Sequence, residues 1–371
     1  MISPDTYKSA LAQQQEEQNN EQSALSIVGS MRENGSNLTA TNHPPLNANS
    51  TYYTFTKNRS EVSNPENNSH TNEFEKGTRI ALVNPTFTSA AYNNSFYVFY
   101  EKHSNTPYGV NVTSDLNLLS NRVINNKKEL SSSVSSMVHL LKNIKLLTSQ
   151  PDITLLTDAD VDNGAIFEND NSENSTTGDN SSTSNNYINA YNAIILGHQE
   201  YVTQKEYDNL RKFVANGGTM IILDGNVFYA QVGYDKNTQI VTLVKGHSWA
   251  FNGKSAWRSV GERWARETSE WVGSNYLCYS CNIRFTNDPF EYRHHEEQYI
   301  TNPHDIILMN YNASLSGYPV QMRPVIATYE LNYQKGRVIA LGIYSDDILS
   351  NGRFDRFFDN LLLQYASKVI D

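Results

Sequence analysis

Two short apolar runs near the middle of the chain enclose a stretch with helical periodicity. Residues 193–196 and 219–223 are almost entirely aliphatic, the pattern of strands that are buried on both faces. Between them, large apolar side chains recur at the spacing of one helical face, at Tyr207, Leu210, Phe213 and Val214. This pattern predicts a strand–helix–strand unit with two parallel strands and a right-handed crossover.

The ends of that helix carry their own signals. Thr203 is an N-cap residue, and Glu206 follows at the position that completes a capping box. Val202 and Tyr207 stand at the two positions of a hydrophobic staple. The glycines at 217–218 supply a left-handed stop before the second strand.

Similar patterns along the chain predict further elements. We expect strands at 79–83, 153–156, 239–244, 325–331 and 337–342, and helices within 129–148, 258–271 and 354–365. Strands and helices that alternate in this way are typical of an α/β, doubly wound sheet.

The domain organisation follows from composition. Residues 1–75 are rich in Gln, Asn, Glu and Ser, so we expect a mostly disordered arm. The folded domain is predicted over 76–371, with the Asn/Ser/Thr tract at 168–186 as a surface loop. Residues 233–300 hold the tryptophans and lack regular α/β alternation, which indicates an inserted cap region beside the strand ends.

Charge and hydropathy narrow the classes of partner. The 371-residue chain has a formal net charge of −10 and no basic cluster, which argues against a nucleic-acid ligand. No apolar run has the length of a membrane span, and no secretory leader is visible at Met1. Oligomer formation stays open.

Glycosylation-type triplets are frequent and favour an extracytoplasmic or cell-surface location, although a cytoplasmic one stays open. They begin at Asn37, Asn49, Asn58, Asn67, Asn93, Asn111, Asn174, Asn180 and Asn312. The two cysteines, Cys278 and Cys281, form a single pair, which indicates a local disulfide or two inert thiols rather than a zinc site.

Most familiar catalytic motifs are missing. The sequence has no Gly-x-Ser-x-Gly elbow, no glycine-rich phosphate loop and no His-Glu-x-x-His motif. The run His294 to Tyr299 reads as a solvated acidic loop, because consecutive side chains of one short loop cannot all converge on an ion. Polar groups at predicted strand ends remain as candidates: Tyr92, Asp158, Asp160, His198, Glu200, Tyr201, Asp224, Asn226, Asp346 and Asp347.

Four motifs carry a family resemblance over about residues 77–366. They are Ala-Tyr-Asn (91–93), Gly-His-Gln-Glu-Tyr-Val-Thr (197–203), Phe-Val-Ala-Asn-Gly-Gly (213–218) and Asp-Gly-Asn-Val-Phe-Tyr (224–229). In this order they resemble the C-terminal domain of the N,N-dimethylformamidase large subunit, a member of the class I glutamine amidotransferase-like superfamily. The resemblance implies a flavodoxin-like three-layer sandwich.

The resemblance also implies an activity, the hydrolysis of a small amide at a non-haem iron held by two tyrosines and a glutamate. Glu200 matches the glutamate and Tyr92 matches one tyrosine, so both are expected metal ligands. His198 and Asn226 match polar groups beside the metal and are the expected catalytic residues. The second tyrosine stays open among Tyr97, Tyr100 and Tyr108.

The sequence also departs from the family pattern. Val202 stands in place of a tryptophan and Asp224 in place of a glycine, and the N-terminal lectin-like region is replaced by the predicted arm. These departures leave an alternative function, a non-catalytic binding module, for example one of the cell surface, that kept the fold and lost the chemistry. Under the enzyme hypothesis we expect Tyr92 and Glu200 to meet across the carboxyl edge of the sheet.

Overall fold

The computed structural model describes residues 77–93, 95–124, 130, 132–142, 151–168, 187–251, 255–258, 261–276, 298–310, 327–342 and 352–366. The predicted arm at 1–75 lies outside these residues. So do both cysteines, Asp346 and Asp347, the acidic run at 294–297, and the tract at 169–186.

The main sheet has seven strands in the order β13-β14-β15-β6-β4-β1-β3. Five strands run parallel: β1 (Arg79–Asn84), β3 (Asp152–Thr157), β4 (Ala193–Leu196), β6 (Thr219–Ile222) and β15 (Gly336–Ala340). The antiparallel hairpin partner β14 (Ala327–Tyr333) and then β13 (Ile306–Asn310) extend one edge. The chain is therefore a mixed α/β protein, and β4 and β6 are adjacent and parallel as predicted.

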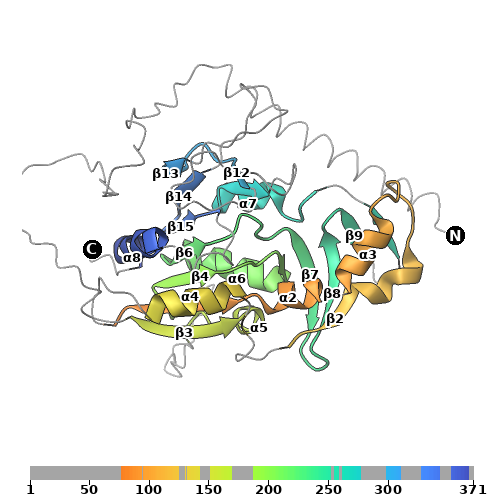
Figure 1. Ribbon diagram of the computed structural model, residues 1–371, viewed down its shortest axis with the longest axis horizontal. Helices are drawn as coiled ribbons and strands as arrows, with labels where there is room; N and C mark the ends of the chain where they lie inside the picture. The colour runs from red at the N-terminus through yellow and green to blue at the C-terminus, as the bar shows by residue number, and fades with distance from the viewer. Residues whose placement is uncertain are drawn as a thin grey trace, which may run out of the picture. The chain divides into compact units, whose positions relative to one another are not determined.

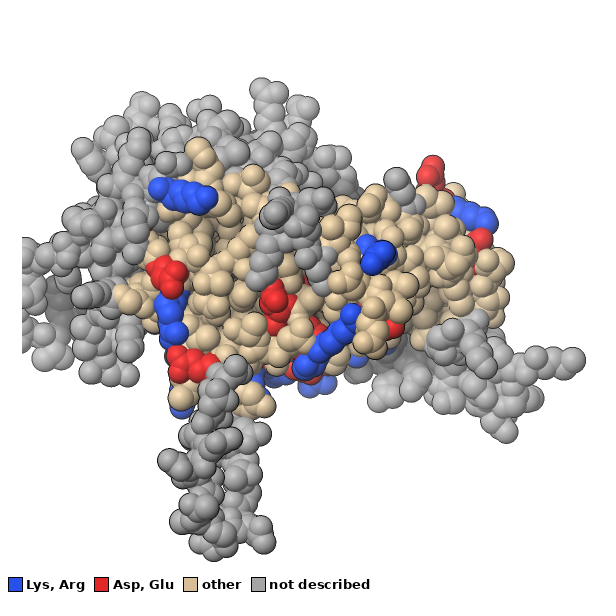
Figure 2. Space-filling model, turned by 90° about the horizontal axis from the view of Figure 1, so that it is seen from below, with Lys and Arg blue, Asp and Glu red and all other residues tan. Residues whose placement is uncertain are grey.

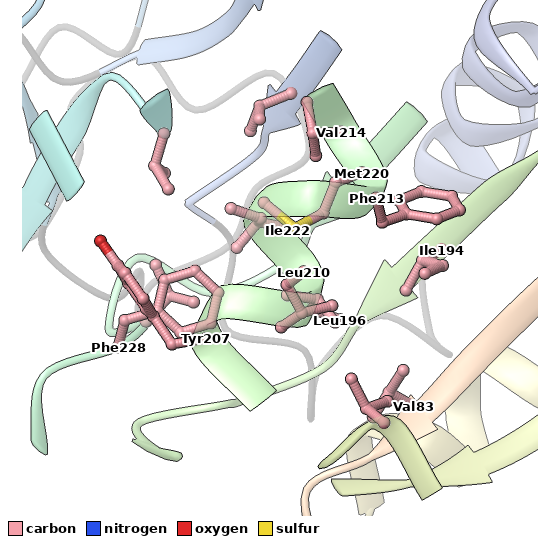
Figure 3. Close-up of a cluster of buried hydrophobic side chains, with 14 of the residues drawn as sticks. Val83, Ile194, Leu196, Tyr207, Leu210, Phe213, Val214, Met220, Ile222 and Phe228 are labelled. Atoms are coloured by element: carbon pink, nitrogen blue, oxygen red, sulfur yellow. The ribbon is translucent and has the colours of Figure 1, made fainter. Parts of the chain in front are cut away.

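Helices cover both faces of this sheet. Successive residues of β1 point to opposite sides, so Leu82 joins a core with α4 (Ser132–Lys142) and α8 (Gly352–Tyr365). Val83 joins the opposite core, which holds α6 (Gln204–Ala215) and α7 (Ala265–Trp271). Figure 3 shows this second core, in which side chains of β1, β4, β6 and α6 interdigitate. Burial on both faces explains why the central strands read as continuous apolar runs.

The cap of α6 forms only in part. Thr203 Oγ1 accepts a hydrogen bond from the Glu206 amide at 3.0 Å, as predicted. The second hydrogen bond of a capping box, from the Thr203 amide to the Glu206 carboxylate, is absent, because neither carboxyl oxygen of Glu206 accepts a hydrogen bond. The Glu206 side chain instead faces the buried Asp158. α6 ends as predicted, because Gly217 lies in the left-handed region at φ +102°.

A second sheet of six strands packs beside the first. Its order is β10-β9-β8-β7-β5, and β2 also pairs with β8. The strands are β2 (Ser120–Arg122), β5 (Tyr201–Val202), β7 (Ala230–Asp235), β8 (Ile240–Gly246), β9 (Trp249–Phe251) and β10 (Ala256–Arg258). The helix expected over 258–271 is wrong in its first half, because residues 256–258 pair with β9 and α7 starts only at Ala265.

The segment after β1 is more helical than predicted. It forms α2 (Thr86–Tyr92), α3 (Phe96–His103) and the short 3-10 helix η1 (Thr113–Leu119). Apolar side chains of α2 and α3 share a third core with the second sheet, and Figure 1 shows α3 beside β8 and β9. The remaining elements are α5 (Asp158–Asp162) and the two-stranded pair β11 (Ser274–Tyr276) and β12 (Gln298–Ile300).

The described surface carries mixed charge. On the face shown in Figure 2, lysine and arginine side chains lie singly among acidic ones. Among the residues that the structure describes, no helix combines the length and apolarity required to cross a bilayer.

Candidate active site

The candidate residues lie at the carboxyl ends of three neighbouring parallel strands. α2 follows β1 and ends at Tyr92, His198 and Glu200 follow β4, and Asp224 follows β6. The crossover helices α4 and α6 pack on opposite faces of the sheet. The chain thus leaves β1 and β4 in opposite directions, and a crevice between such strands is the usual place for a ligand in an open α/β sheet.

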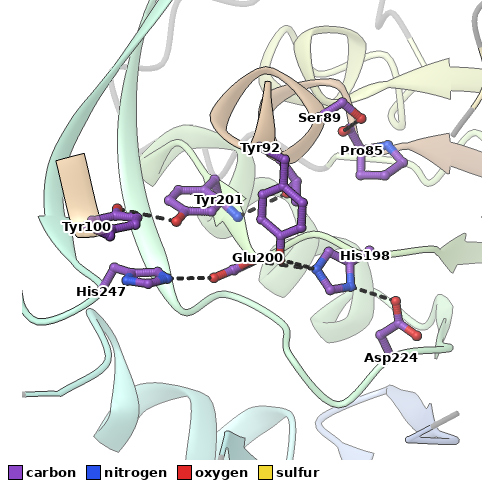
Figure 4. A network of polar contacts seen from close by, with 10 residues as sticks. Pro85, Ser89, Tyr92, Tyr100, His198, Glu200, Tyr201, Asp224 and His247 are labelled. Atoms are coloured by element: carbon purple, nitrogen blue, oxygen red, sulfur yellow. Dashed lines mark hydrogen bonds and ion pairs between the residues drawn. The ribbon is translucent and has the colours of Figure 1, made fainter. Parts of the chain in front are cut away.

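Three side chains meet at this edge. The Tyr92 hydroxyl lies 3.0 Å from His198 Nε2 and donates a short hydrogen bond to Glu200 Oε2. His198 Nε2 lies 3.6 Å from the same carboxylate oxygen. Figure 4 shows the phenol, the imidazole and the carboxylate converging from α2 and from the loop after β4. The approach of Tyr92 to Glu200 is the arrangement expected from the sequence.

Asp224 holds the imidazole in place. Its Oδ2 lies 2.6 Å from His198 Nδ1, so the opposite ring nitrogen, Nε2, faces Tyr92 and Glu200. A carboxylate on the far nitrogen fixes the orientation of a functional histidine. Asp224, one of the two residues at which the chain departs from the family pattern, therefore contacts the candidate site.

His247 is a member of the cluster that sequence reasoning missed. It lies in the turn between β8 and β9, and its Nε2 is 3.3 Å from Glu200 Oε1. Its ring stacks on Tyr100 with a centroid distance of 4.0 Å and an interplanar angle of 4°. No motif marks His247, because it reaches the site through the second sheet.

The cluster holds one carboxylate between two imidazoles. Burial alone would raise the pKa of Glu200, but hydrogen bonds and charge from His198 and His247 outweigh it and hold that pKa well below its usual range. Burial likewise lowers the pKa of His198, yet the carboxylates of Asp224 and Glu200 raise it well above the ordinary value. These opposite pKa shifts favour an ionised Glu200 beside a doubly protonated His198.

Tyr92 is a neutral phenol in the same arrangement. The residue as a whole is 38 % exposed, but its hydroxyl lies inward against Glu200 and His198. Burial of that hydroxyl, followed by the charge of Glu200, raises the pKa of Tyr92 well above that of free tyrosine. Only a nearby cation would reverse this balance and favour the phenolate.

The three tyrosines that the sequence offers as the second metal ligand, Tyr97, Tyr100 and Tyr108, lie in different surroundings. The Tyr97 ring meets the Tyr92 ring edge-on at 4.9 Å, and Tyr97 contributes to the raised pKa of Tyr92. The Tyr100 hydroxyl instead accepts a hydrogen bond from Tyr201 at 3.3 Å. Tyr108 is exposed under the guanidinium of Arg258. Of the three, Tyr97 is the one beside Tyr92.

Other candidates have structural partners. Asp160 caps α5 through a reciprocal bond with Thr157, and Tyr201 is a buried strand residue. Asp158 is buried and accepts the Phe87 amide at 2.6 Å. Asn226 is buried on the loop after β6, and its Oδ1 has no hydrogen-bond partner. The structure thus brings together Tyr92, His198, Glu200 and Asp224, and leaves Asn226 with an unused acceptor.

The side chains at this edge of the sheet determine which metal ion could be coordinated there. Within the described part of the chain, no group of three or more His, Cys, Asp or Glu side chains is arranged to hold a metal. Tyr92 and Glu200 do present a phenol and a carboxylate oxygen to one point. Hard oxygen donors of this kind suit Fe(III).

Comparison with known families agrees with these motifs. The family model described as N,N-dimethylformamidase beta subunit-like, C-terminal, matches residues 62–304. The chain belongs to this family. The matched residues include Tyr92, His198, Glu200, Asp224 and His247. None of the curated proteins compared with the chain matches it.

Solved structures give only remote likenesses. A ThuA-like protein from Bacteroides uniformis has 12 % identity and a TM-score of 0.36 over 81 % of this chain and 95 % of that chain. A cytoplasmic protein from Salmonella typhimurium has 9 % identity and a TM-score of 0.34 over 78 % of this chain and 100 % of that chain. A GH42 β-galactosidase from G. stearothermophilus has 12 % identity and a TM-score of 0.36 over 80 % of this chain, and the match spans 31 % of the enzyme.

Proposed function

We propose that the protein is an amide hydrolase whose active site is the cluster of Tyr92, His198 and Glu200. The observation that carries the proposal is the convergence of the Tyr92 hydroxyl and His198 Nε2 on Glu200 Oε2. Membership in a dimethylformamidase-like family supports an amidase-like activity. A small amide, such as an N-substituted formamide, is the proposed substrate class.

We also propose that the main sheet and its helices form a flavodoxin-like three-layer sandwich. Numbered along the chain, the parallel strands β1, β3, β4, β6 and β15 lie in the order 2-1-3-4-5. That order is the flavodoxin-like one, in which the ligand binds at the switch point between the first and third strands. Those strands are β1 and β4 here, and they carry Tyr92 and Glu200 to the site. Strand order therefore supports both the fold and the place of the site.

Iron is the proposed cofactor. Tyr92 and Glu200 would hold it, and Tyr97 is the proposed further tyrosine because it lies beside Tyr92. A bound Fe(III) would supply Lewis acidity toward the amide carbonyl. The unused Oδ1 of Asn226 is a buried acceptor near the same sheet edge, and we propose that it binds an N–H group or water of the occupied site.

His198 is proposed to donate the proton that the leaving nitrogen requires. Amide hydrolysis adds a water oxygen to the carbonyl carbon, breaks the C–N bond and requires a proton on the leaving nitrogen. Asp224 and Glu200 raise the pKa of His198 and so favour its doubly protonated form, whose Nε2–H can supply that proton as a general acid. The proton lost by water then restores the imidazolium, so atoms and charge balance over the cycle.

Two measurements test the proposal. Protein purified without chelator should contain near-stoichiometric iron and show the visible charge-transfer band of an iron–tyrosinate pair. Incubation with N,N-dimethylformamide should release dimethylamine and formate. Tyr92→Phe should lose the band, the metal and the hydrolysis, whereas Tyr187→Phe, at an exposed tyrosine over Lys212, should keep all three.

The alternative of a binding module has one observation in its favour. The carboxylate of Glu200 already lies against two imidazoles, that of His198 at 3.6 Å and that of His247 at 3.3 Å, without a cation. A folded, colourless protein that takes up no iron and cleaves no formamide would contradict the enzyme proposal and favour this alternative.

A further inference from the structure

His247 is presented to Glu200 by an unusual turn. Gly246, His247 and Ser248 have φ values of +104°, +49° and +67°, so three consecutive residues are left-handed. Two of them carry side chains, which disfavour this region. The glycine cannot be replaced without conflict, because a Cβ there would lie 2.6 Å from the Tyr229 carbonyl oxygen. The backbone around His247 is therefore tightly located against the start of β7.

Aromatic rings then fix the imidazole plane. It stacks on Tyr100 at 4.0 Å and lies nearly parallel to Tyr201 at 5.8 Å, with Tyr229 edge-on at 5.2 Å. Held in this way, the ring points Nε2 at Glu200 Oε1, 3.3 Å away (Figure 4). The side chain of Glu200 is only 2 % exposed, so water cannot readily replace that partner.

The two oxygens of Glu200 are thereby divided between the two sheets. Oε2 faces Tyr92 and His198 at the edge of the main sheet, and Oε1 faces His247 from the second sheet. The terminal torsion of a glutamate is broad, so a carboxylate bound on one side only is free to rotate. We infer that His247 is a positioning residue, which holds Oε1 so that Oε2 stays aimed at the proposed iron and substrate. This inference rests on the proposed function.

A purely structural role makes a different prediction. If His247 matters only as a ring that packs on Tyr100, another aromatic ring should replace it and an amide should not. If His247 matters as an N–H donor to Glu200, an amide should replace it and an aromatic ring without a donor should not. His247→Phe keeps a flat ring without a donor, and His247→Gln keeps a donor without a ring, so the two variants separate the roles.

The first experiment measures iron affinity by competition with a chelator. Loss of a partner that orients a metal ligand commonly weakens metal binding about 10- to 100-fold. We expect a loss of this size in His247→Phe and substantial recovery in His247→Gln. The exposed His304→Gln is the control and should bind as the wild type does. Tyr100→Leu removes the stacking partner while keeping the donor, and should bind more tightly than His247→Phe.

The second experiment uses metal-free protein, so it remains informative if the proposed function fails. The infrared carboxylate bands of Glu200 can be identified by difference against Glu200→Gln. They should shift in His247→Phe and return toward wild type in His247→Gln. Wild-type protein that binds no iron would end the proposed function, while unshifted bands in His247→Phe would overturn the positioning role. A different outcome would show that the ring matters only for packing: His247→Phe keeps the wild-type iron affinity and carboxylate bands, and His247→Gln loses both.

Discussion

The Tyr92 hydroxyl donates a hydrogen bond to Glu200 Oε2 across 108 positions of sequence. The contact depends on strand register, because Val83 pairs with Leu196 and so brings the ends of β1 and β4 level. α2 then carries Tyr92 forward from β1, while a short loop carries Glu200 forward from β4. A shift in this register would separate the two side chains and abolish their contact.

Glu200→Gln should separate the roles of charge and shape. The amide keeps the size of the side chain and its hydrogen-bonding capacity but removes the charge that a cation requires. We expect iron binding to be lost, while the free energy of unfolding falls by only about 1–3 kcal/mol. Chelator competition and urea unfolding measure the two effects. Glu168→Gln, at an exposed carboxylate paired with Arg79, should change neither.

Asp224→Asn should act through His198. Removing the carboxylate on Nδ1 takes away one of the two groups that raise the pKa of His198, so that pKa should fall. Nitrogen NMR of the imidazole in metal-free protein would follow the titration directly. Hydrolysis should drop about 10- to 100-fold. An unchanged titration of His198 would show that Glu200 alone sets its charge.

A buried pair of acids makes stability depend on pH. Burial raises the pKa of Asp158 to about 7, and burial together with the charge of Asp158 raises the pKa of Glu206 well above its usual range. Both groups hold protons in the folded state that the unfolded chain releases above about pH 4. The free energy of unfolding should therefore fall as pH rises from about 4 to 7, by about 1.4 kcal/mol for each unit of raised pKa.

Asp158→Asn tests this dependence, because an amide needs no proton to be buried. Urea unfolding at several pH values should give a shallower decline for the variant than for the wild type. Asp208→Asn, at an exposed acid of α6, should keep the wild-type slope. Parallel curves for Asp158→Asn and wild type would mean that the pair shares no proton in the folded state.

Gly336→Ala should destabilise the sheet strongly. A Cβ at this first residue of β15 would meet the backbone oxygens of Val214 and Gly218, which cannot move aside as a side chain can. We expect a loss of about 3 kcal/mol or more, at or above the upper end for overpacking. Thermal or urea unfolding would measure it. At Gly233 the nearest atom to a Cβ would be Val244 Cγ2 at 3.6 Å, so Gly233→Ala should change stability little.

The central unit could be predicted from sequence because its signals are local. The aliphatic runs, the stripe on α6, the Thr203 cap and the Gly217 stop depend only on neighbouring residues, and each appears in the structure. The same locality explains why polar residues could be placed at strand ends. Motif order then indicated the family, and Tyr92 with Glu200 as partners.

The contacts that complete the site depend on distant residues. His247 arrives from a turn of the second sheet, and no periodic pattern connects it to Glu200. Glu206 has the spacing of a capping box, but its carboxyl lies beside Asp158, which the main sheet brings there from another strand end. The sequence by itself determined the strands, the helix and the residues that end them. Only the tertiary structure decided which side chains meet, because strand register and sheet packing set those distances.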